Sequence, residues 1–177
     1  MWELYDALIG GIPDSAPQVT AYKCGGHWGI VEAGEYAAGA MYVDESSISP
    51  MHPESFLGVS LHDMAGYIKS WNFAEASLGA AAINAWYNSP KNAMAQDIIA
   101  GKDKKERNAF FTYKEKIAGK KVAVVGHFPF LETQFAPVCS LSILERSPQR
   151  GDYPDTACEY LLPQQDYVFI TGVTLTN

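Results

Sequence analysis

The spacing of hydrophobic and polar positions changes near the middle of the chain. In the first half, two alternating runs at residues 18–24 and 27–33 flank Gly25-Gly26, a pair typical of a two-residue hairpin turn. A third alternating run, residues 36–43, follows another glycine-containing turn. This pattern predicts a three-stranded antiparallel meander, in which the residues on either side of the first turn form a cross-strand pair.

Segments with helical spacing of apolar residues precede and follow these predicted strands in the sequence. Residues 1–9 form a short amphipathic pattern that ends at two glycines, and Ser60 is a suitable N-cap for a helix over residues 61–71. Residues 73–87, FAEASLGAAAINAWY, contain one ionisable side chain, Glu75. A helix that is apolar on most faces must be buried, so the first half predicts an α+β domain built around this helix.

The second half alternates short apolar runs with helical segments. Residues 122–125, 141–144 and 167–170 are continuous apolar runs, as in strands of buried parallel sheets. Three strands alternating with helices predict a parallel α/β sheet, in a second domain of residues 101–177 that follows a first domain of residues 1–100. The helices expected beside these strands cover residues 103–118, 131–135 and 156–161.

A parallel sheet of three strands leaves an exposed edge. The final residues, VTLTN, resemble the approach to another helix. We therefore expect the second domain to be incomplete, as a portion of a longer natural chain. Homodimer pairing across the exposed edge is the alternative, and it would make the protein an interaction module.

Composition narrows the class of protein. The net charge is −7, and residues 1–100 carry three basic against eleven acidic side chains. The basic residues between Lys102 and Lys121 are interleaved with acids, a pattern that favours a solvated helix face over nucleic-acid binding. No apolar run approaches the roughly 18 residues of a membrane span, and the N-terminus lacks the features of a signal peptide.

Three widely spaced cysteines favour a reducing, cytoplasmic location over a disulfide framework.

The segment KKVAVVGHFPF (residues 120–130) opens like a nucleotide-binding unit, with a strand and then Gly126. The dinucleotide fingerprint requires two further glycines, and Phe128 stands at the second position. Pro129 also removes an amide donor. The loop is therefore not expected to hold the pyrophosphate of NAD or FAD.

Other polar residues fall at the same predicted sheet edge. His127 follows a strand end, where open α/β sheets bind ligands, and an imidazole there could bind metal or transfer protons. Glu145 ends the second strand, 19 residues after Gly126, where an acid can hold a ribose hydroxyl. The alternative for Glu145 is a surface acid paired with a nearby arginine. The third strand ends at Thr171, Gly172 and Thr174.

A second metal-binding candidate lies in the first hairpin. Cys24 and His27 flank Gly25-Gly26 and are predicted to lie side by side as a cross-strand pair. A thiol and an imidazole suit zinc, copper or nickel, although a structural zinc site needs four ligands. The alternative is that both are ordinary hairpin residues.

Three segments (residues 58–85, 120–130 and 141–177) resemble a family of prokaryotic, uncharacterised proteins that are described as heavy-metal chelation proteins. The resemblance covers most of the chain. It implies an enolase N-terminal-like domain followed by a Rossmann-like domain. In family members, the Rossmann-like domain contains several more strands and helices. The family's motifs fall on Gly126-His127-Phe128-Pro129, Glu145, Gly151-Asp152-x-Pro154 and Thr171-Gly172-x-Thr174.

The leading functional prediction is a heavy-metal chelation protein that binds its ligand in a cleft between the two domains. One wall would contain Gly126, His127, Glu145, Asp152 and Thr171 to Thr174, and the other would include Asn72 and Glu75. The expected ligand is a transition-metal ion or a small anionic or metal-chelating compound. The alternative is a transferase or lyase that uses a mononucleotide or S-adenosylmethionine, and the sequence does not decide whether the protein is an enzyme.

Overall fold

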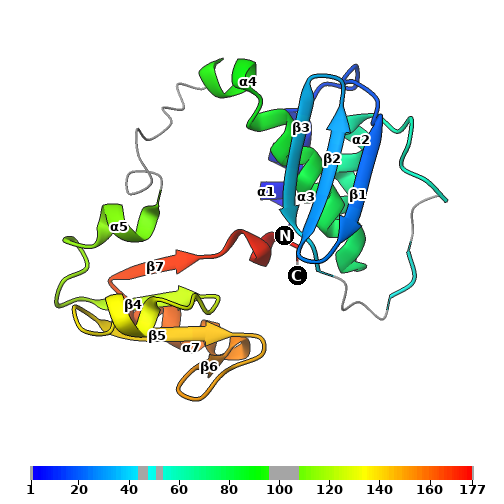
Figure 1. Ribbon diagram of the computed structural model, residues 1–177. Coiled ribbons are helices and arrows are strands. Elements are labelled where there is room, and N and C mark those ends of the chain that lie inside the picture. The colour runs from blue at the N-terminus through cyan, green and yellow to red at the C-terminus, as the bar shows by residue number, and fades with distance from the viewer. Residues whose placement is uncertain (1, 44–47, 51–53, 96–107, 177) are drawn as a thin grey trace. The chain divides into compact units, whose positions relative to one another are not determined.

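The computed structural model describes residues 2–43, 48–50, 54–95 and 108–176. It divides into two compact units (Figure 1): the first unit comprises Met1–Ile99 and Gly172–Asn177, and the second unit comprises Ala100–Thr171. The sequence analysis assigned residues 172–177 to the second domain, but residues 172–176 pack with the first unit. The Tyr5 hydroxyl donates to the Leu175 carbonyl (3.2 Å), and Leu175 contacts the apolar core of the first unit.

The first unit contains the antiparallel meander that the alternating pattern predicts. Its strands pair in the order β1-β2-β3, each antiparallel to the next. Along β2 every second residue is buried, so one face of the sheet lies against the core and the other faces solvent. The strands are β1 (Ala21–Gly25), β2 (Trp28–Ala33) and β3 (Tyr36–Met41).

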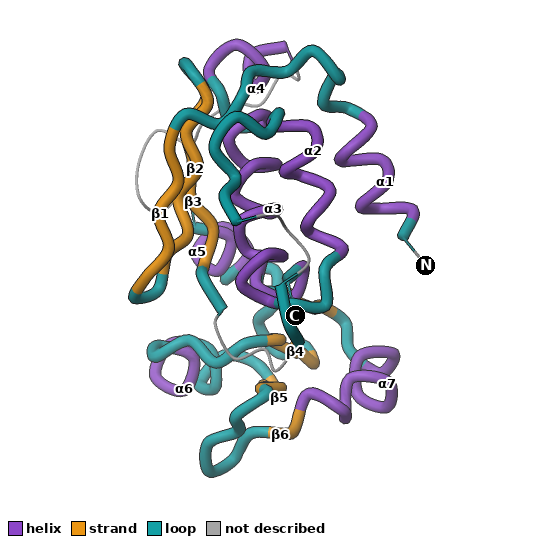
Figure 2. The backbone as a smooth tube through the Cα atoms, turned by 90° about the vertical axis from the view of Figure 1, so that its right-hand side faces the viewer, coloured by secondary structure: helices purple, strands orange, loops and turns teal. Residues whose placement is uncertain are grey.

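Helices α1, α2 and α3 lie on one side of this sheet (Figure 2), and α3 packs directly against β2 and β3. Two of them begin where side chains cap them: the Ser60 hydroxyl accepts from the Asp63 N–H, and the Asn72 amide oxygen accepts from the Glu75 N–H. The predicted bounds of α3 are confirmed. The helices are α1 (Glu3–Gly10), α2 (Leu61–Gly66), α3 (Phe73–Tyr87) and α4 (Pro90–Ala95), with a 3₁₀ turn at Tyr67–Lys69.

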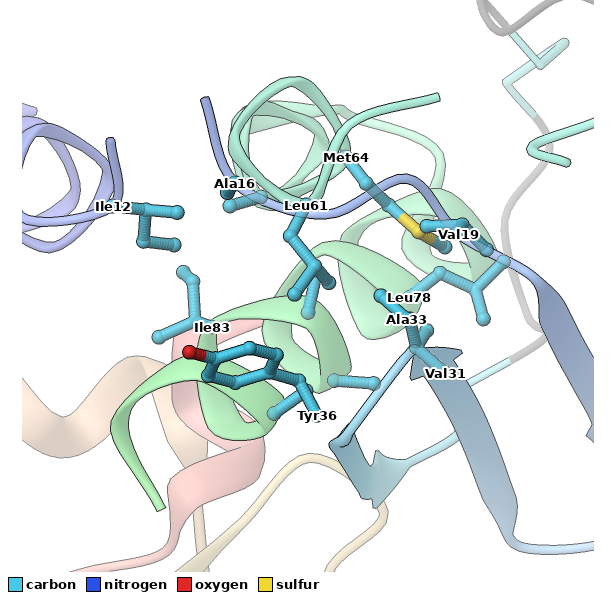
Figure 3. Packing of buried hydrophobic residues seen from close by; sticks show 14 of the residues in the cluster. Ile12, Ala16, Val19, Val31, Ala33, Tyr36, Leu61, Met64, Leu78 and Ile83 are labelled. Atoms are coloured by element: carbon cyan, nitrogen blue, oxygen red, sulfur yellow. The ribbon is translucent and has the colours of Figure 1, made fainter. Parts of the chain in front are cut away.

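The core of the first unit lies between α3, α2 and the sheet. Figure 3 shows Leu61, Met64 and Leu78 together with Val19 and Val31 in this cluster of buried side chains. The expectation that α3 is buried is confirmed, because Ala81, Ile83 and Ala85 are 0%, 7% and 1% exposed.

Gly79 allows α3 to approach the backbone of the preceding 3₁₀ turn. A Cβ at this position would lie 2.2 Å from the Ile68 nitrogen and 2.7 Å from the Tyr67 carbonyl carbon, so the segments would have to separate. We expect Gly79→Ala to lower the free energy of unfolding by about 1–3 kcal/mol, although alanine favours a helix more than glycine does. Urea denaturation checks this result. Gly66→Ala is the control, because no atom lies within 4 Å of a Cβ there, and equal losses for both variants would contradict the close approach.

The second unit contains a parallel sheet with the strand order β6-β5-β4-β7. The three predicted strands and their parallel pairing are confirmed. The fourth, β6, is a two-residue strand that contains Pro154 and carries no hydrophobic pattern by which it could have been predicted. The strands are β4 (Lys121–Val125), β5 (Ser140–Glu145), β6 (Tyr153–Pro154) and β7 (Tyr167–Ile170).

The helices of this unit are shorter than the sequence suggested. The charged helix predicted over residues 103–118 falls partly outside the described residues, and its described part is helical only to Tyr113 before turns follow. Phe110 from that helix packs between Phe128, Phe135 and Phe169, with ring centroids 4.9–5.3 Å apart. The helical segments are α5 (Ala109–Tyr113), α6 (Leu131–Gln134) and α7 (Cys158–Leu161), with 3₁₀ turns at Asp155–Ala157 and Leu162–Gln164; a further 3₁₀ turn, Gly172–Leu175, lies in the first unit.

Within the described part of the chain, no helix combines the length and the apolar character that crossing a bilayer requires.

Candidate functional site

The loop that follows β4 begins with a glycine whose conformation excludes other residues. Gly126 has φ +107°, and a Cβ there would lie 3.0 Å from the Thr171 methyl carbon. The Gly126 N–H donates to the Leu144 carbonyl of the adjacent strand (2.8 Å). The glycine is thus explained by the turn and by its contact with Thr171, without any need for a phosphate group close to the backbone.

Phe128 occupies the position of the second fingerprint glycine, and its side chain points into the aromatic cluster. Its ring centroid lies 5.1 Å from that of Phe110 and 6.0 Å from that of Phe130. The Phe128 carbonyl accepts from the Leu131 N–H (3.1 Å), which starts the short helix α6. Gly126 to Pro129 therefore form a compact turn anchored by an aromatic side chain.

His127, between these two residues, has carboxylates at both ring nitrogens. Nδ1 lies 2.9 Å from Oδ2 of Asp152, and Nε2 lies 3.1 Å from Oε1 of Glu132. The imidazole is 10% exposed and the Asp152 carboxylate 3%, whereas the Glu132 side chain is 55% exposed. One side of the ring is thus fixed within the protein, and the other meets an acid that reaches solvent.

Glu145 organises the backbone around this histidine. Its Oε2 accepts from the His127 N–H (2.9 Å), and its Oε1 accepts from the N–H groups of Arg146 (2.7 Å) and Ser147 (3.3 Å). These bonds connect the loop after β4 with the loop after β5. The carboxylate thus positions both loops, a role different from the ribose contact and from the arginine pairing that the sequence suggested for it.

The Asp152 carboxylate is held in turn by its own loop. Oδ2 accepts from the Gln149 N–H (2.9 Å), and the Asp152 N–H donates to the Gln149 carbonyl (3.0 Å). Because Asp152 is buried and has this donor, its carboxylate is an acceptor for the proton on Nδ1 of His127. In the neutral ring this contact favours the tautomer with the proton on Nδ1, which leaves the lone pair of Nε2 on the side of Glu132.

The acids around His127 favour its charged form. The hydrogen bond to Asp152 is the main cause that raises the pKa of His127 above its usual 6.5. Partial burial opposes this shift, and the negative charges of Asp152, Glu132 and Glu145 add to it. A raised pKa in the folded state means that the pair stabilises the protein fully below the unfolded-state pKa, and this stabilisation is lost as the pH rises through the folded-state pKa.

We expect Asp152→Asn to lower the pKa of His127, because the substitution removes the largest cause that raises it. The pH-dependent stabilisation described above would then disappear at a lower pH than in the wild type. NMR titration of the His127 ring protons measures the pKa directly. Asp155→Asn, a more exposed acid that pairs with Arg146 in the following turn, is the control and should leave the titration unchanged.

Asn72 and Glu75 lie in the first unit, at the start of α3. Glu75 is 1% exposed, and its Oε2 accepts from the Ser70 hydroxyl at 2.5 Å. The Asn72 side chain caps α3 through the Glu75 N–H (3.1 Å) and donates to the Ile48 carbonyl (2.7 Å). Both side chains thus have structural partners within the first unit.

The predicted cross-strand pair of Cys24 and His27 is wrong. Cys24 pairs with Gly29, and Gly25 pairs with Trp28, so the turn consists of Gly26 and His27. Gly26, at φ +59°, supplies the left-handed turn residue, which moves the turn along the chain by one residue. A shift of one position changes the face of a strand. Cys24 therefore packs toward the core, whereas His27 is exposed in the turn.

The remaining predicted residues at this strand end fall in different units. Thr171, which follows β7, donates its N–H to the Val125 carbonyl (3.1 Å) and contacts Gly126. Gly172 and Thr174 belong to the 3₁₀ turn Gly172–Leu175 of the first unit. Of the predicted set, the second unit therefore joins His127 with Glu145, Asp152 and Thr171 around Gly126.

Among the described residues, no three His, Cys, Asp or Glu side chains group as a site that could hold a metal ion. Around His127, the potential metal ligands are one imidazole nitrogen, Nε2, and the adjacent carboxylate of Glu132. The sequence analysis did not identify this carboxylate, Glu132, although an acid in the first turn of a helix directly after a strand-end loop could have pointed to it.

Comparisons with known proteins agree with the resemblance noted in the sequence. Two family models, each described as "Putative heavy-metal chelation", match residues 5–87 (DUF4213) and 108–177 (DUF364). A crystal structure of a DUF364 family protein of unknown function from Desulfitobacterium hafniense DCB-2 is 42% identical, with a TM-score of 0.89, over 99% of this chain and 70% of that one. Another DUF364 family protein of unknown function, from Pyrococcus horikoshii, is 20% identical with a TM-score of 0.72, over 98% of this chain and 69% of that one. None of the curated proteins matches this chain.

Proposed function

Since this chain belongs to the DUF364 family, whose models carry the heavy-metal chelation description, we propose that it binds a transition-metal ion through Nε2 of His127. Glu132 is the second ligand in this proposal. The observation that carries it is the pairing of Nδ1 with the buried Asp152 carboxylate. Metal-binding histidines usually donate their other ring N–H to such a partner, which fixes the ring and makes the free nitrogen more basic.

The distance between the two ligand atoms fits a shared ion. Nitrogen and oxygen atoms that each lie about 2.0–2.2 Å from one zinc ion are roughly 3.3–3.6 Å apart at the ideal tetrahedral angle, and closer where that angle is smaller. Nε2 of His127 and Oε1 of Glu132 lie 3.1 Å apart. An imidazole with a carboxylate suits zinc, nickel or copper, with affinity following the usual order of these metals.

Two protein ligands leave further coordination positions for other donors. Glu132 is more than half exposed, so those positions are open to solvent. Water molecules or the donor groups of a small chelating compound would occupy them. The proposed ligand is therefore a hydrated metal ion or a metal ion that arrives with a small-molecule chelator.

The transferase or lyase alternative has less support from this geometry. It needs Glu145 to face a nucleoside ribose and Gly126 to admit a phosphate or a similar group. Both oxygens of Glu145 accept backbone N–H groups instead, and Phe128 anchors the turn in the aromatic cluster.

Equilibrium dialysis against Zn²⁺, Ni²⁺ and Cu²⁺, followed by metal analysis, tests the proposal. The wild type should bind one equivalent of at least one metal, and Glu132→Gln should weaken binding about 10-fold or more, because the amide removes a negative ligand. His27→Ala, which removes an exposed histidine from the first unit, is the control and should leave binding unchanged. A wild type that binds none of the three metals would overturn the proposal.

A further inference from the structure

The outer face of the first-unit sheet carries large apolar side chains. Trp28, Ile30 and Met41 are 59%, 42% and 45% exposed. Helices α1, α2 and α3 lie on the other side of the sheet (Figure 2). Exposed side chains of this size, gathered on one face, are typical of an interaction surface.

The strand register arranges this face as three rows of three residues. Trp28 of β2 lies between Gly25 and Met41, and Ile30 lies between Lys23 and Gly39. The indole also leans over Gly39, since its Cε3 is 3.7 Å from where a Cβ would stand there. The rows are Gly25–Trp28–Met41, Lys23–Ile30–Gly39 and Ala21–Glu32–Ala37, and we name these nine residues the outer sheet face.

One basic and one acidic residue flank the apolar centre of the outer sheet face. Lys23 lies beside Ile30 on β1, and Glu32 lies two residues beyond Ile30 on β2. Among the ion pairs of the described residues, none involves Lys23 or Glu32. The face therefore presents two opposite charges, each available to another molecule.

From this arrangement we infer that the outer sheet face binds a second copy of this chain. A two-fold axis that lies in the face and runs through Ala21, Ile30 and Met41 exchanges the position of Lys23 with that of Glu32. Each lysine then faces the Glu32 of the second copy, the two Ile30 side chains meet on the axis, and the two indoles meet beside it. The strands of the two copies cross at a steep angle, as in orthogonal sheet packings.

The size of the face sets the strength of this association. Three strands of five or six residues cover roughly 17 by 14 Å at ordinary strand spacings, an area well below the ~800 Å² per partner of a standard stable interface. The dimer is therefore weak and depends on protein concentration. Its specificity comes from the reciprocal Lys23–Glu32 pairs, because like charges facing one another would oppose it.

Sedimentation equilibrium over a range of protein concentrations tests this inference. The wild type should show a monomer–dimer equilibrium, and Trp28→Thr should raise the dimer Kd about 10-fold or more. Lys23→Glu and Glu32→Lys should each weaken the dimer, since each places like charges opposite one another. The double variant Lys23→Glu/Glu32→Lys restores opposite charges and should recover most of the affinity.

Circular dichroism of each variant checks that the exposed substitutions leave the fold intact. A wild type that stays monomeric at the highest attainable concentration would overturn the inference. So would a dimer that is indifferent to Trp28→Thr, or one that the charge exchange fails to restore. The metal-binding test above uses residues of the second unit, so the two proposals can fail separately.

Discussion

Replacing Ala82 with glutamate is expected to remove a large part of the stability of the first unit. Ala82 is 0% exposed in the middle of α3, among the apolar side chains that join the helix to the sheet and to α2. Leaving a charge buried without a partner costs roughly 3–5 kcal/mol, against a total stability of about 5–15 kcal/mol for a typical domain. Thermal denaturation followed by circular dichroism should show a large fall in Tm.

The native carboxylate of the same helix, Glu75, shows why the cost of a buried charge depends on its position in α3. Glu75 is as buried as Ala82, but it lies in the first turn of α3, where the helix dipole favours a negative charge, and it accepts from the Ser70 hydroxyl. A glutamate at position 82 lies about two turns further along and has neither advantage. Ala80→Glu is the matched control, since Ala80 is only partly buried and should lose less stability. An unchanged Tm for Ala82→Glu would contradict the burial of this position.

Elements with a strong local pattern could be predicted from the sequence. α3 matches its predicted bounds because residues 73–87 are almost uniformly apolar between Asn72, which caps the helix, and Asn88. The parallel strands β4 and β5 were predicted to within one residue because buried parallel strands are continuous apolar runs.

Features that depend on backbone conformation or on partners distant in the chain could not be predicted from the sequence. Either glycine of Gly25-Gly26 can adopt a left-handed conformation, so the sequence left the hairpin register open by one residue, and Cys24 was assigned the wrong neighbour. β6 is too short to show a period.

The candidate site was predicted in part. The strand-end rule placed His127 and Glu145 near one sheet edge, and the family resemblance added Asp152, but neither gave their contacts. Asp152 is 25 residues from His127 along the chain, and the hydrogen bond between them depends on how the loop after β5 returns to the sheet. Glu132 is close in sequence, yet it meets Nε2 only because the turn at Gly126–Pro129 brings the start of α6 back toward the ring.

Metal binding by His127→Ala is expected to fall at least ~100-fold, because the substitution removes the proposed nitrogen ligand together with the ring that Asp152 orients. Isothermal titration with the metal that the wild type binds measures this loss. His27→Ala is again the control, since His27 is exposed in the β1–β2 turn of the first unit.

The pH dependence of binding separates a role as ligand from a role in folding. A ring nitrogen must lose its proton before it binds a metal, and the surrounding acids, with the Asp152 hydrogen bond first, raise the pKa of His127 above 6.5. Wild-type affinity should therefore begin to fall when the pH drops below that raised pKa, by about 10-fold for each further pH unit. Any binding that remains in His127→Ala should lack this steep fall. If His127→Ala instead binds as tightly as the wild type between about pH 5 and 8, the range in which histidine changes charge, His127 is not a ligand and its pairing with Asp152 serves the loop structure alone.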